Sequence, residues 1–587
     1  MNEKKIAPEL NEADKAQAND DALLKIVMED FVEAREYIRR SYRDIWNDCW
    51  KCYNNIRTKR GYEGVADDFV PETFTIVESV KANVAGGKPK FNFLPTREEQ
   101  NTDVTVLNAL VDYYWACNNM TQKTLDWVQD MLVYGNGIMM VSWEGDKPHY
   151  TNIPLADFFV DPTATHMNRP EDPGYPKFAG YRFLTSREEL KNRKIVDPET
   201  GEMEALYKNL DDISAIDGEF DRTDKQDKEQ FLGSTLGDNS KEKQVEVIVY
   251  YTRKKKVLIA NRQTIIYDGD NPYKREAKTK TVEMDMDGVP VSTEVKIPEI
   301  KGFLPFAILR NYVDTSLFFA KGDVENILPR QEALNDVSSQ KHDNLTYAMN
   351  NMWQIDPQYK HLAEQIESLP GAVFPIPQGA LQPIEKQLIG ADADIEMRRI
   401  QEEMRRATAA DEVVQGVSQS QGRVTATEVQ AQMNQASQRF STKLTTLEDE
   451  GFAQLARLTY YMMQIFVTQE TAVRIVGPEG VTWKDYNPDD YMDEYEPHVQ
   501  LESTTKALKA EEGQKFALVH QMYSQSPFVD QKEMARVYFE SMLDIPEAQM
   551  KRLLPDQPPM AAMPQTPGQA PIQNPGGVPS GPLPAAI

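Results

Sequence analysis

The chain has 587 residues, with 65 lysines and arginines against 92 aspartates and glutamates, which gives a formal net charge of −27. Apolar residues make up 40% of it and charged residues 27%, so it is expected to fold around large cores. The acidic balance argues against a protein that grips nucleic acid over its whole surface, although it allows one that touches DNA without adhering to it. Three cysteines, no stretch of 18 apolar residues and no secretory signal predict a protein of a reducing compartment without a spanning helix.

Catalytic motifs are absent from the sequence. No glycine-rich segment has the spacing of a phosphate-binding P-loop, and neither an HExxH zinc motif nor a GxSxG nucleophile motif occurs. Cys49 and Cys52 form a CxxC pair, whose functional alternatives are half a zinc site or a redox pair. Both fall on the apolar face of a predicted helix, so we expect core side chains. We therefore expect no enzyme activity, no cofactor and no metal site.

The N-terminal part of the chain is expected to be helical. Residues 1–20 are polar and predict a flexible N-terminus. Apolar residues at steps of three and four then predict three helices, over residues 21–57, 70–85 and 100–134. Asp20 or Asp21 can cap the first of them, and Gly135 can close the third with a positive φ.

A β section follows. Short apolar runs predict strands over residues 138–143, 178–183, 245–252, 257–260 and 264–268. Residues 153–162 predict an extended segment closed by Asp161-Pro162. Alternation over residues 244–250 predicts a half-buried strand. Residues 197–243 are mostly charged and polar, so we expect an exposed insertion outside the core.

The character of the chain changes at residue 321. Residues 321–350 predict a helix that is polar on most faces, residues 351–390 a compact proline-rich module, and residues 391–412 a second helix. These helices lack the apolar surface for a bundle of their own, so we expect their charges to pair with copies of the same helix in a ring. The charged residues expected at this interface are Arg398, Arg399, Glu402, Glu403, Arg405 and Arg406.

A polar loop over residues 413–424 leads into a very long helix. Thr425 and Glu428 have the spacing of a capping box, which predicts a helix over residues 425–468, and Gly451 is the expected place for a kink. Short strands, further helices and a disordered proline-rich tail are predicted after it, over residues 471–502, 503–554 and 555–587.

Four local phrases stand out along the chain, none of them catalytic. They are Tyr134-Gly135-Asn136-Gly137, Asp157-Phe158-Phe159-Val160-Asp161-Pro162, Phe319-Ala320-Lys321-Gly322-Asp323-Val324-Glu325 through Leu334-Asn335, and residues 419–429 with Thr425-Ala426-Thr427-Glu428-Val429. Together with the order of the predicted elements, these phrases resemble the portal proteins of tailed bacteriophages, especially the short-tailed-phage type. The resemblance covers about residues 20–555.

The resemblance implies an α+β, mainly helical, elongated multi-domain fold that assembles as a ring. Its parts would be a flexible N-terminus (1–20), a wing (21–320, with the insertion 197–243), two stem helices (321–350 and 391–412), a clip (351–390), a tunnel loop (413–424), a long kinked wing helix with following strands (425–502), crown helices (503–554) and a disordered tail (555–587). The tunnel-loop residues that would face the DNA channel are Gln415, Gly416, Ser418, Gln419, Ser420, Gln421, Gly422 and Arg423.

The implied function is that of a dodecameric DNA conduit at one capsid vertex, for viral genome packaging and ejection. The implied partners are further copies of the chain, double-stranded DNA in transit, the terminase large subunit, a head–tail adaptor, and the major capsid and scaffolding proteins, with no membrane. The implied location is the virion, and the host cytoplasm during assembly. Two alternatives stay open: a packaging ATPase or nuclease, against which the missing P-loop counts, and another oligomeric head–tail connector or tail-hub protein.

Overall fold

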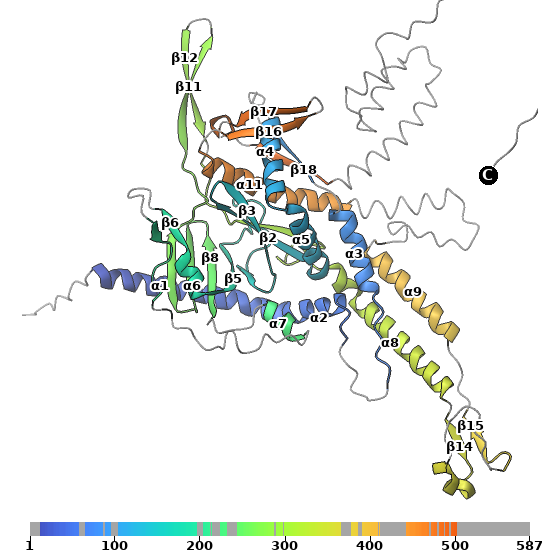
Figure 1. Ribbon diagram of the computed structural model, residues 1–587. Coiled ribbons are helices and arrows are strands. Elements are labelled where there is room, and N and C mark those ends of the chain that lie inside the picture. Colours follow the sequence, from blue (N-terminus) through green and yellow to red (C-terminus); the bar gives the residue numbers. More distant parts are fainter. Residues whose placement is uncertain are drawn as a thin grey trace, which may run out of the picture. The chain divides into compact units, whose positions relative to one another are not determined.

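The structure is a computed structural model in which two compact units are distinguished, Met1–Ile475 with Thr482–Ala507, and Val476–Val481 with Leu508–Ile587. It describes residues 12–57, 65–85, 89–95, 104–196, 203–211, 213, 224–231, 244–286, 289–297, 299–350, 352–365, 377–384, 390–408, 410, 442–468, 471–477, 480–486, 488–491 and 495–501. Nearly all of these belong to the first unit. Helices and small antiparallel sheets make up the described part (Figure 1), which confirms the α+β, mainly helical fold class.

The described α-helices are α1 (Glu12–Ser41), α2 (Arg43–Tyr53), α3 (Glu72–Ala85), α4 (Val104–Cys117), α5 (Met120–Tyr134), α6 (Arg187–Asn192), α7 (Asp224–Phe231), α8 (Asp323–Met349), α9 (Gly390–Thr408) and α11 (Ala453–Phe466). The other helical segments are the 3₁₀ helices η1 (Pro357–Gln365) and η3 (Pro488–Tyr491) and the π-helical segment η2 (Glu448–Phe452).

The described strands are β1 (Lys90–Pro95), β2 (Asn136–Glu144), β3 (Lys147–Ile153), β4 (Phe158–Val160), β5 (Phe178–Ser186), β6 (Lys194–Val196), β7 (Met203–Ala205), β8 (Gln244–Thr252), β9 (Lys255–Ala260), β10 (Thr264–Asp270), β11 (Lys278–Met286), β12 (Val289–Ile297), β13 (Phe306–Arg310), β14 (Trp353–Ile355), β15 (Leu381–Pro383), β16 (Thr471–Gly477), β17 (Gly480–Tyr486) and β18 (Tyr495–Gln500).

Two sheets form the centre of the first unit. One has five strands in the order β10-β9-β8-β5-β4, and the other has three in the order β13-β2-β3. The ring of Phe306 on β13 lies 5.3 Å from Phe158, 6.3 Å from Tyr181 and 5.9 Å from Tyr251, all on the five-stranded sheet. Burial of these aromatic rings joins the two sheets in one hydrophobic core.

The long N-terminal helix is broken in two. The prediction of one helix over residues 21–57 was wrong, because Tyr42 has non-helical φ and ψ of −132° and −31° and separates α1 from α2. α1 also begins before the two aspartates that were expected to cap it, so they lie inside the helix. After the break, Trp46 is buried and its neighbour Ile45 is exposed.

The helix predicted over residues 100–134 is likewise two helices, α4 and α5. Asn119 has a φ of 52°, a left-handed conformation that an α-helix cannot continue through. The predicted end of α5 is confirmed, because Gly135 has a φ of 90° and its N–H donates to the carbonyl of Met131.

The alternation over residues 244–250 predicted a strand buried on one face only. Strand β8 is instead buried on both faces. Its polar residue Glu246 is 1% exposed and accepts from Arg182 at 3.1 Å and from Arg262 at 2.8 Å. A buried carboxylate is tolerated when it is paired in this way. The polar position in the strand pattern therefore marks a buried ion pair and not a solvent-facing side chain.

Two further predictions for the β section need correction. Residues 153–162 are not extended throughout, since a turn over residues 155–157 precedes β4. Within the insertion 197–243, the described residues are partly core: Tyr207, Leu210 and Ile213 are buried. Helix α7 from the same insertion lies against α2, with the Phe231 ring 6.0 Å from Trp50.

The helix predicted over residues 425–468 is described from residue 442. At the expected kink the chain forms the π-helical turn η2, which precedes α11. A Cβ on Gly451 would stand 2.2 Å from Cδ2 of Leu309, so close packing on β13 requires glycine here. The predicted crown helices (503–554) and disordered tail (555–587) lie outside the described residues.

Candidate functional site

Helices α8 and α9 form an antiparallel pair, as the helix–module–helix pattern predicted. Arg330 on α8 pairs with Glu403 on α9 at 3.2 Å, and Lys341 on α8 pairs with Asp394 on α9 at 2.5 Å. The residue numbers of the partners increase along α8 and decrease along α9, so the two helices run in opposite directions. The two-stranded sheet β14–β15, with Trp353 opposite Pro383, joins the helices at one end (Figure 1). We call this assembly the α8–α9 pair.

A row of buried polar side chains runs along α8. Gln331, Asn335 and Ser339, each one helical turn after the last, are all buried. Oε1 of Gln331 accepts from the backbone N–H of Thr73 at 3.1 Å, and Oδ1 of Asn335 accepts from that of Val70 at 3.0 Å. We call these three residues the polar row.

Towards the end of α8, further hydrogen bonds join the helix to the backbone of residues 66–68. The hydroxyl of Ser339 accepts from the N–H of Asp68 at 3.1 Å, and a carboxylate oxygen of Asp343 accepts from that of Ala66 at 2.7 Å. Arg57 donates to Ser339 at 2.7 Å from the same side. Much of the polar surface of α8 is therefore used within the subunit, whereas the charges of this helix had been expected to pair with copies of the same helix.

The start of α8 is fixed to the end of α5 by two of the phrases quoted for the family resemblance. Nδ2 of Asn136 donates to the carbonyl of Ala320 at 3.0 Å, and Oδ1 of Asn136 accepts from the N–H of Ala320 at the same distance. A Cβ on Gly135 would stand 2.1 Å from that carbonyl oxygen. Residues 134–137 and 319–325 thus form one close junction, which we call the root of α8.

A buried ion pair ties the root to the helix that follows the predicted loop. Nζ of Lys443 lies 2.6 Å from Oδ2 of Asp323, and the Asp323 side chain is 1% exposed. The same ammonium group lies 5.4 Å from the centre of the Tyr312 ring. Asp323 is also in the first turn of α8, where a carboxylate is favoured by the exposed backbone N–H groups.

The residues predicted for the ring interface divide into two groups. Arg405 turns inward: its Nε lies 2.8 Å from Glu72, a residue 6% exposed, to which Gln401 also donates at 3.0 Å. Glu403 is occupied by Arg330 of its own chain.

The other four interface residues lie on the outer side of α9. Arg399 is paired along the helix with Glu396 at 2.7 Å, and Arg406 with Glu402 at 3.7 Å. Arg398 is exposed as well. Such pairs, with both side chains in water, contribute only about 0–1 kcal/mol each. Arg398, Arg399, Glu402 and Arg406 are thus placed where another molecule can reach them.

The predicted channel residues, from Gln415 to Arg423, lie outside the described residues. The described chain on either side of them is held by the two buried pairs given above, Arg405 with Glu72 and Lys443 with Asp323. Sequence reasoning missed Glu72, Asn136 and Lys443 as positioning residues. Their partners are distant in the chain, and only the Gly-Asn-Gly phrase around Asn136 gave a local signal.

The CxxC pair is part of the core, as predicted. Cys49 and Cys52 are buried, and burial raises the pKa of both thiols, that of Cys52 to about 11. Thiols with raised pKa values are poor nucleophiles and poor metal ligands. Among the described residues no group of three or more His, Cys, Asp or Glu side chains is arranged to hold a metal ion. Nor does any described helix have the length and apolar content needed to cross a membrane.

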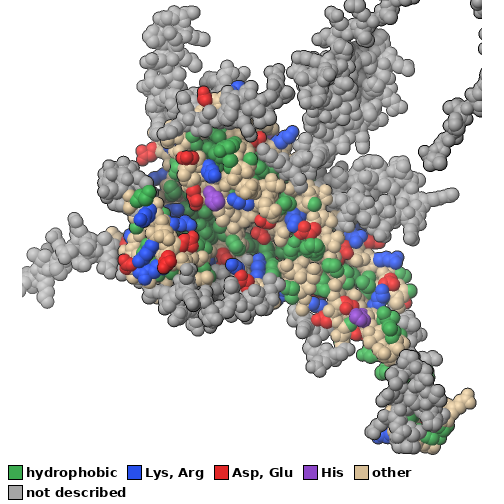
Figure 2. Space-filling model, in the orientation of Figure 1, with side chains coloured by type: hydrophobic (Ala, Val, Ile, Leu, Met, Phe, Trp, Pro, Cys, Tyr) green, Lys and Arg blue, Asp and Glu red, His purple; other side chains and the backbone are tan. Residues whose placement is uncertain are grey.

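Large apolar side chains are exposed at the end of the α8–α9 pair farthest from the root. Green side chains are visible there on the molecular surface (Figure 2). The residues are Leu345, Tyr347, Met349, Met352, Trp353, Ile384 and Ile395. Met349 is the most exposed of them, at 76%. We call these residues the distal apolar surface; exposed apolar clusters of this kind mark sites where other proteins bind.

The comparisons with known proteins point to one family. The family model described as "Phage SU10 portal protein" matches residues 144–573. No curated protein matches the chain. Similar solved structures include a chain from the "Virion of native gene transfer agent (GTA) particle", with 11% identity, a TM-score of 0.39, and coverage of 84% of this chain and 92% of that chain.

Two further structures are chains from the "Neck of empty GTA particle computed with C6 symmetry" and the "Neck of native GTA particle computed with C12 symmetry". The first has 11% identity, a TM-score of 0.38, and coverage of 81% and 91% of the two chains. The second has 10% identity, a TM-score of 0.37, and coverage of 80% and 89%. The family match itself spans most of the chain and includes the α8–α9 pair and the predicted loop, and on this match the chain belongs to the family of the phage SU10 portal protein.

Proposed function

We propose that the chain is the subunit of a closed ring that forms the DNA conduit at one vertex of a phage capsid. The genome would enter through the ring during packaging and leave through it during ejection. The observation that carries the proposal is the family match over residues 144–573. An acidic subunit suits a conduit, because a net charge of −27 keeps the DNA from adhering to most of its surface.

The geometry of the α8–α9 pair supports assembly into a ring. The polar row fixes α8 to its own subunit, while Arg398, Arg399, Glu402 and Arg406 are exposed on α9. Identical subunits that contact one another through two different surfaces close into a ring when the rotation between neighbours divides a full turn. We propose about twelve subunits, with the four exposed charges of α9 at the contact between neighbours.

The sheet β14–β15 and its flanking residues are proposed as the clip, where the terminase large subunit and later the head–tail adaptor dock. The distal apolar surface supports this assignment, since Met352 and Trp353 are exposed without forming part of the subunit core. A surface that must bind two partners in succession has to remain exposed in the isolated ring.

Native mass spectrometry of the purified full-length chain tests the ring. We expect a closed assembly of about twelve subunits of 66.9 kDa each. A monomer that hydrolyses nucleotide would contradict the proposal and favour the packaging-enzyme alternative. A small assembly with no closed ring in electron micrographs would favour the connector or tail-hub alternative.

The channel loop is tested separately. Deletion of residues 416–422, which include Gly416 and Gly422, should leave the empty ring intact but reduce DNA packaging or retention in the head. Serine and glutamine side chains can exchange hydrogen bonds with phosphates, and Arg423 adds one charge per subunit, so contacts are expected to be weak and salt-sensitive. Normal packaging of full-length genomes by the deletion variant would exclude a DNA-handling role for the loop.

A further inference from the structure

The insertion 197–243 places one short helix, α7, against a distant part of the chain. Residues 214–223 and 232–243, on either side of α7, lie outside the described residues. Figure 1 shows α7 beside α2, where the Phe231 ring packs on Trp50. The insertion therefore touches the helical part of the subunit as well as its sheets, and what this contact does is not evident from the sequence.

Aromatic rings and ammonium groups join α7 to two helices. The Phe231 ring lies 6.0 Å from Trp50 on α2, and Nζ of Lys51 lies 5.0 Å from the centre of the Phe231 ring. Nζ of Lys228 lies 6.0 Å from the centre of the Trp50 ring and 5.3 Å from that of Tyr134, the last residue of α5. Contacts between a cation and a ring face depend on their mutual orientation. The docked α7 therefore bridges α2 and α5.

A small cavity lies where α7 meets these two helices. Its volume is about 140 Å³, and it is bounded by α2, α5, residues 152–156 and Lys228 of α7. The aromatic part of its lining is Trp46, Trp50 and Tyr134. Since one water molecule takes up roughly 30 Å³ in the liquid, the space has room for several of them. Helix α7 thus borders a space that is not filled as a packed core would be.

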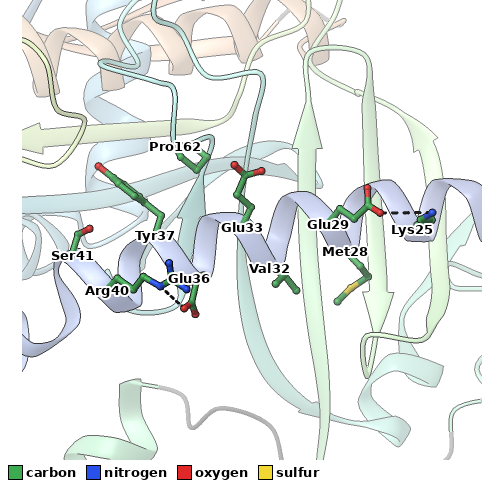
Figure 3. Close-up of a pocket in the computed structure, with 10 residues that line it drawn as sticks. All are labelled: Lys25, Met28, Glu29, Val32, Glu33, Glu36, Tyr37, Arg40, Ser41 and Pro162. Atoms are coloured by element: carbon green, nitrogen blue, oxygen red, sulfur yellow. Dashed lines mark hydrogen bonds and ion pairs between the residues drawn. The ribbon is translucent and has the colours of Figure 1, made fainter.

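A larger groove on the outer face of α1 provides the contrast (Figure 3). Its volume is about 760 Å³, and all of its lining residues except Pro162 belong to α1. Its cations are paired along the same helix, Lys25 with Glu29 at 3.9 Å and Arg40 with Glu36 at 2.6 Å. That groove is the open side of a single helix. The smaller cavity is bounded by four separate segments, and α7 is one of them.

The walls of the small cavity continue into the root of α8. The Trp46 ring lies 5.3 Å from Phe319, and Tyr134 directly precedes Gly135, so both walls end in residues of the root. Helices α2 and α5 also pack against α8 themselves. A helix that bridges α2 and α5 across the cavity therefore supports the two elements that fix the start of α8.

Helix α7 is too short to stay helical away from this position. It has eight residues, and isolated helices shorter than about 12–15 residues are marginal in water. Its sequence contains one apolar residue, Phe231, which is 51% exposed even when docked. Release of α7 therefore uncovers little apolar area, and its docking and its folding are a single event.

We propose that α7 is a releasable strap at the root of α8, and we call it the strap. When docked, it ties α2 to α5 through Phe231 and Lys228. When released, it unfolds, opens the cavity to water and leaves the end of α5 less firmly held, while the core stays folded. Because the two events are linked, a change that strengthens the root strengthens the docking of the strap by the same factor. The insertion thereby sets how rigidly α8 is joined to the rest of the subunit.

Hydrogen–deuterium exchange of the full-length assembly, measured by mass spectrometry, tests the release. A helix of eight residues bonds the N–H groups of its last four internally, here residues 228–231. In the wild type these groups should exchange about tenfold or more faster than those of α2, because the strap opens while the core stays closed. Equal protection of the strap and α2 would overturn the proposal, since the two would then open only together.

Lys228→Gln combined with Phe231→Ser tests the link to the root. The exchange rate over residues 131–135, where the N–H of Gly135 donates to Met131, should rise by about threefold or more. The thermal midpoint should stay within about 2 °C of the wild type, because the core is unchanged. A larger drop would show that α7 is part of the core and would overturn the proposal.

Lys225→Gln combined with Phe74→Ser is the matched control. Lys225 lies on the strap but pairs along it with Glu229 at 3.7 Å, and Phe74 is a comparably exposed phenylalanine on α3, at 42%. This variant should leave the exchange rate over residues 131–135 within about twofold of the wild type. Equal rates in the two double variants would show that the strap does not hold the root, and the proposal would fail.

Discussion

The two parts of α8 differ in which side chains they bury and which they expose. From the root to Ser339, the polar side chains Gln331, Asn335 and Ser339 are buried together with Val324 and Leu334. In the distal half, Leu345, Tyr347 and Met349 are exposed. Amides and a hydroxyl are inside because backbone groups of residues 66–73 are there to pair with them. The apolar side chains of the distal half are exposed because no described part of the subunit covers them, which is expected of a surface kept for partners.

The largest effect should come from the root. In Gly135→Ala the new Cβ would stand 2.1 Å from the carbonyl oxygen of Ala320, at a φ of 90°. We expect a loss of about 3–5 kcal/mol in the free energy of unfolding, measured by urea denaturation. Gly145→Ala is the matched control, because Gly145 also has a positive φ, of 62°, but no atom lies within 4 Å of its Cβ position. It should cost about 1 kcal/mol. Equal losses would show that the close approach at the root contributes nothing.

Charge reversal on α9 should divide its arginines into two classes. Arg405→Glu places a second carboxylate beside the buried Glu72, and we expect a loss of about 3 kcal/mol in subunit stability. Arg398→Glu combined with Arg406→Glu should change subunit stability by less than about 1 kcal/mol and yet impair ring assembly. Urea denaturation measures the first effect and electron microscopy of the assemblies the second. Intact rings in the double variant would argue against this side of α9 as the contact between subunits.

The polar row should respond more strongly than its neighbours on the same helix. Asn335→Ala removes the acceptor for the N–H of Val70 and for Nε2 of Gln331, both inside the protein. Buried donors left unpaired cost about 1–3 kcal/mol, so we expect a loss of about 2 kcal/mol in unfolding free energy. Gln340→Ala, at an exposed position of α8, should change it by less than about 0.5 kcal/mol. A small effect at Asn335 would mean that water replaces these hydrogen bonds at little cost.

The smallest effect on stability is expected at the distal apolar surface. Met352→Ser together with Trp353→Ser removes apolar groups that are already in contact with water, so the thermal midpoint should stay within about 2 °C. Self-association of the assemblies at high concentration should decrease in light scattering, because the exposed apolar area is smaller. Leu94→Ser, at an exposed position on β1, serves as the control and should not change self-association. A clear drop in the thermal midpoint would show that these residues belong to the subunit core.

Local patterns were sufficient to predict α3, α8 and the strands β8, β9 and β10, because their periodicity and their closing residues lie within the segment itself. They could not predict the breaks at Tyr42 and Asn119, which depend on the backbone angles of single residues. The burial of the polar row could not be predicted either, because its partners lie 258 to 271 residues away in the chain.

The charged residues of α9 show the same limit. Arg398 and Arg405 have the same side chain in the same helical pattern, and only the position of Glu72, on another helix, distinguishes the exposed Arg398 from the half-buried Arg405. The family resemblance predicted an order of domains. The division of the charged α9 residues between contacts within the subunit and surfaces open to other molecules came from the structure.

The polar row also determines how α8 can respond to a mechanical load. Its hydrogen bonds repeat at every turn and run to one continuous stretch of backbone. A slide of the helix by a fraction of a turn would break them all at once, and the acceptors would meet the next backbone groups only after a full turn of about 5.4 Å. A load along the helix axis would therefore meet a stiff support that gives way in a single step, and below that threshold α8 would transmit the load to residues 66–73 without yielding.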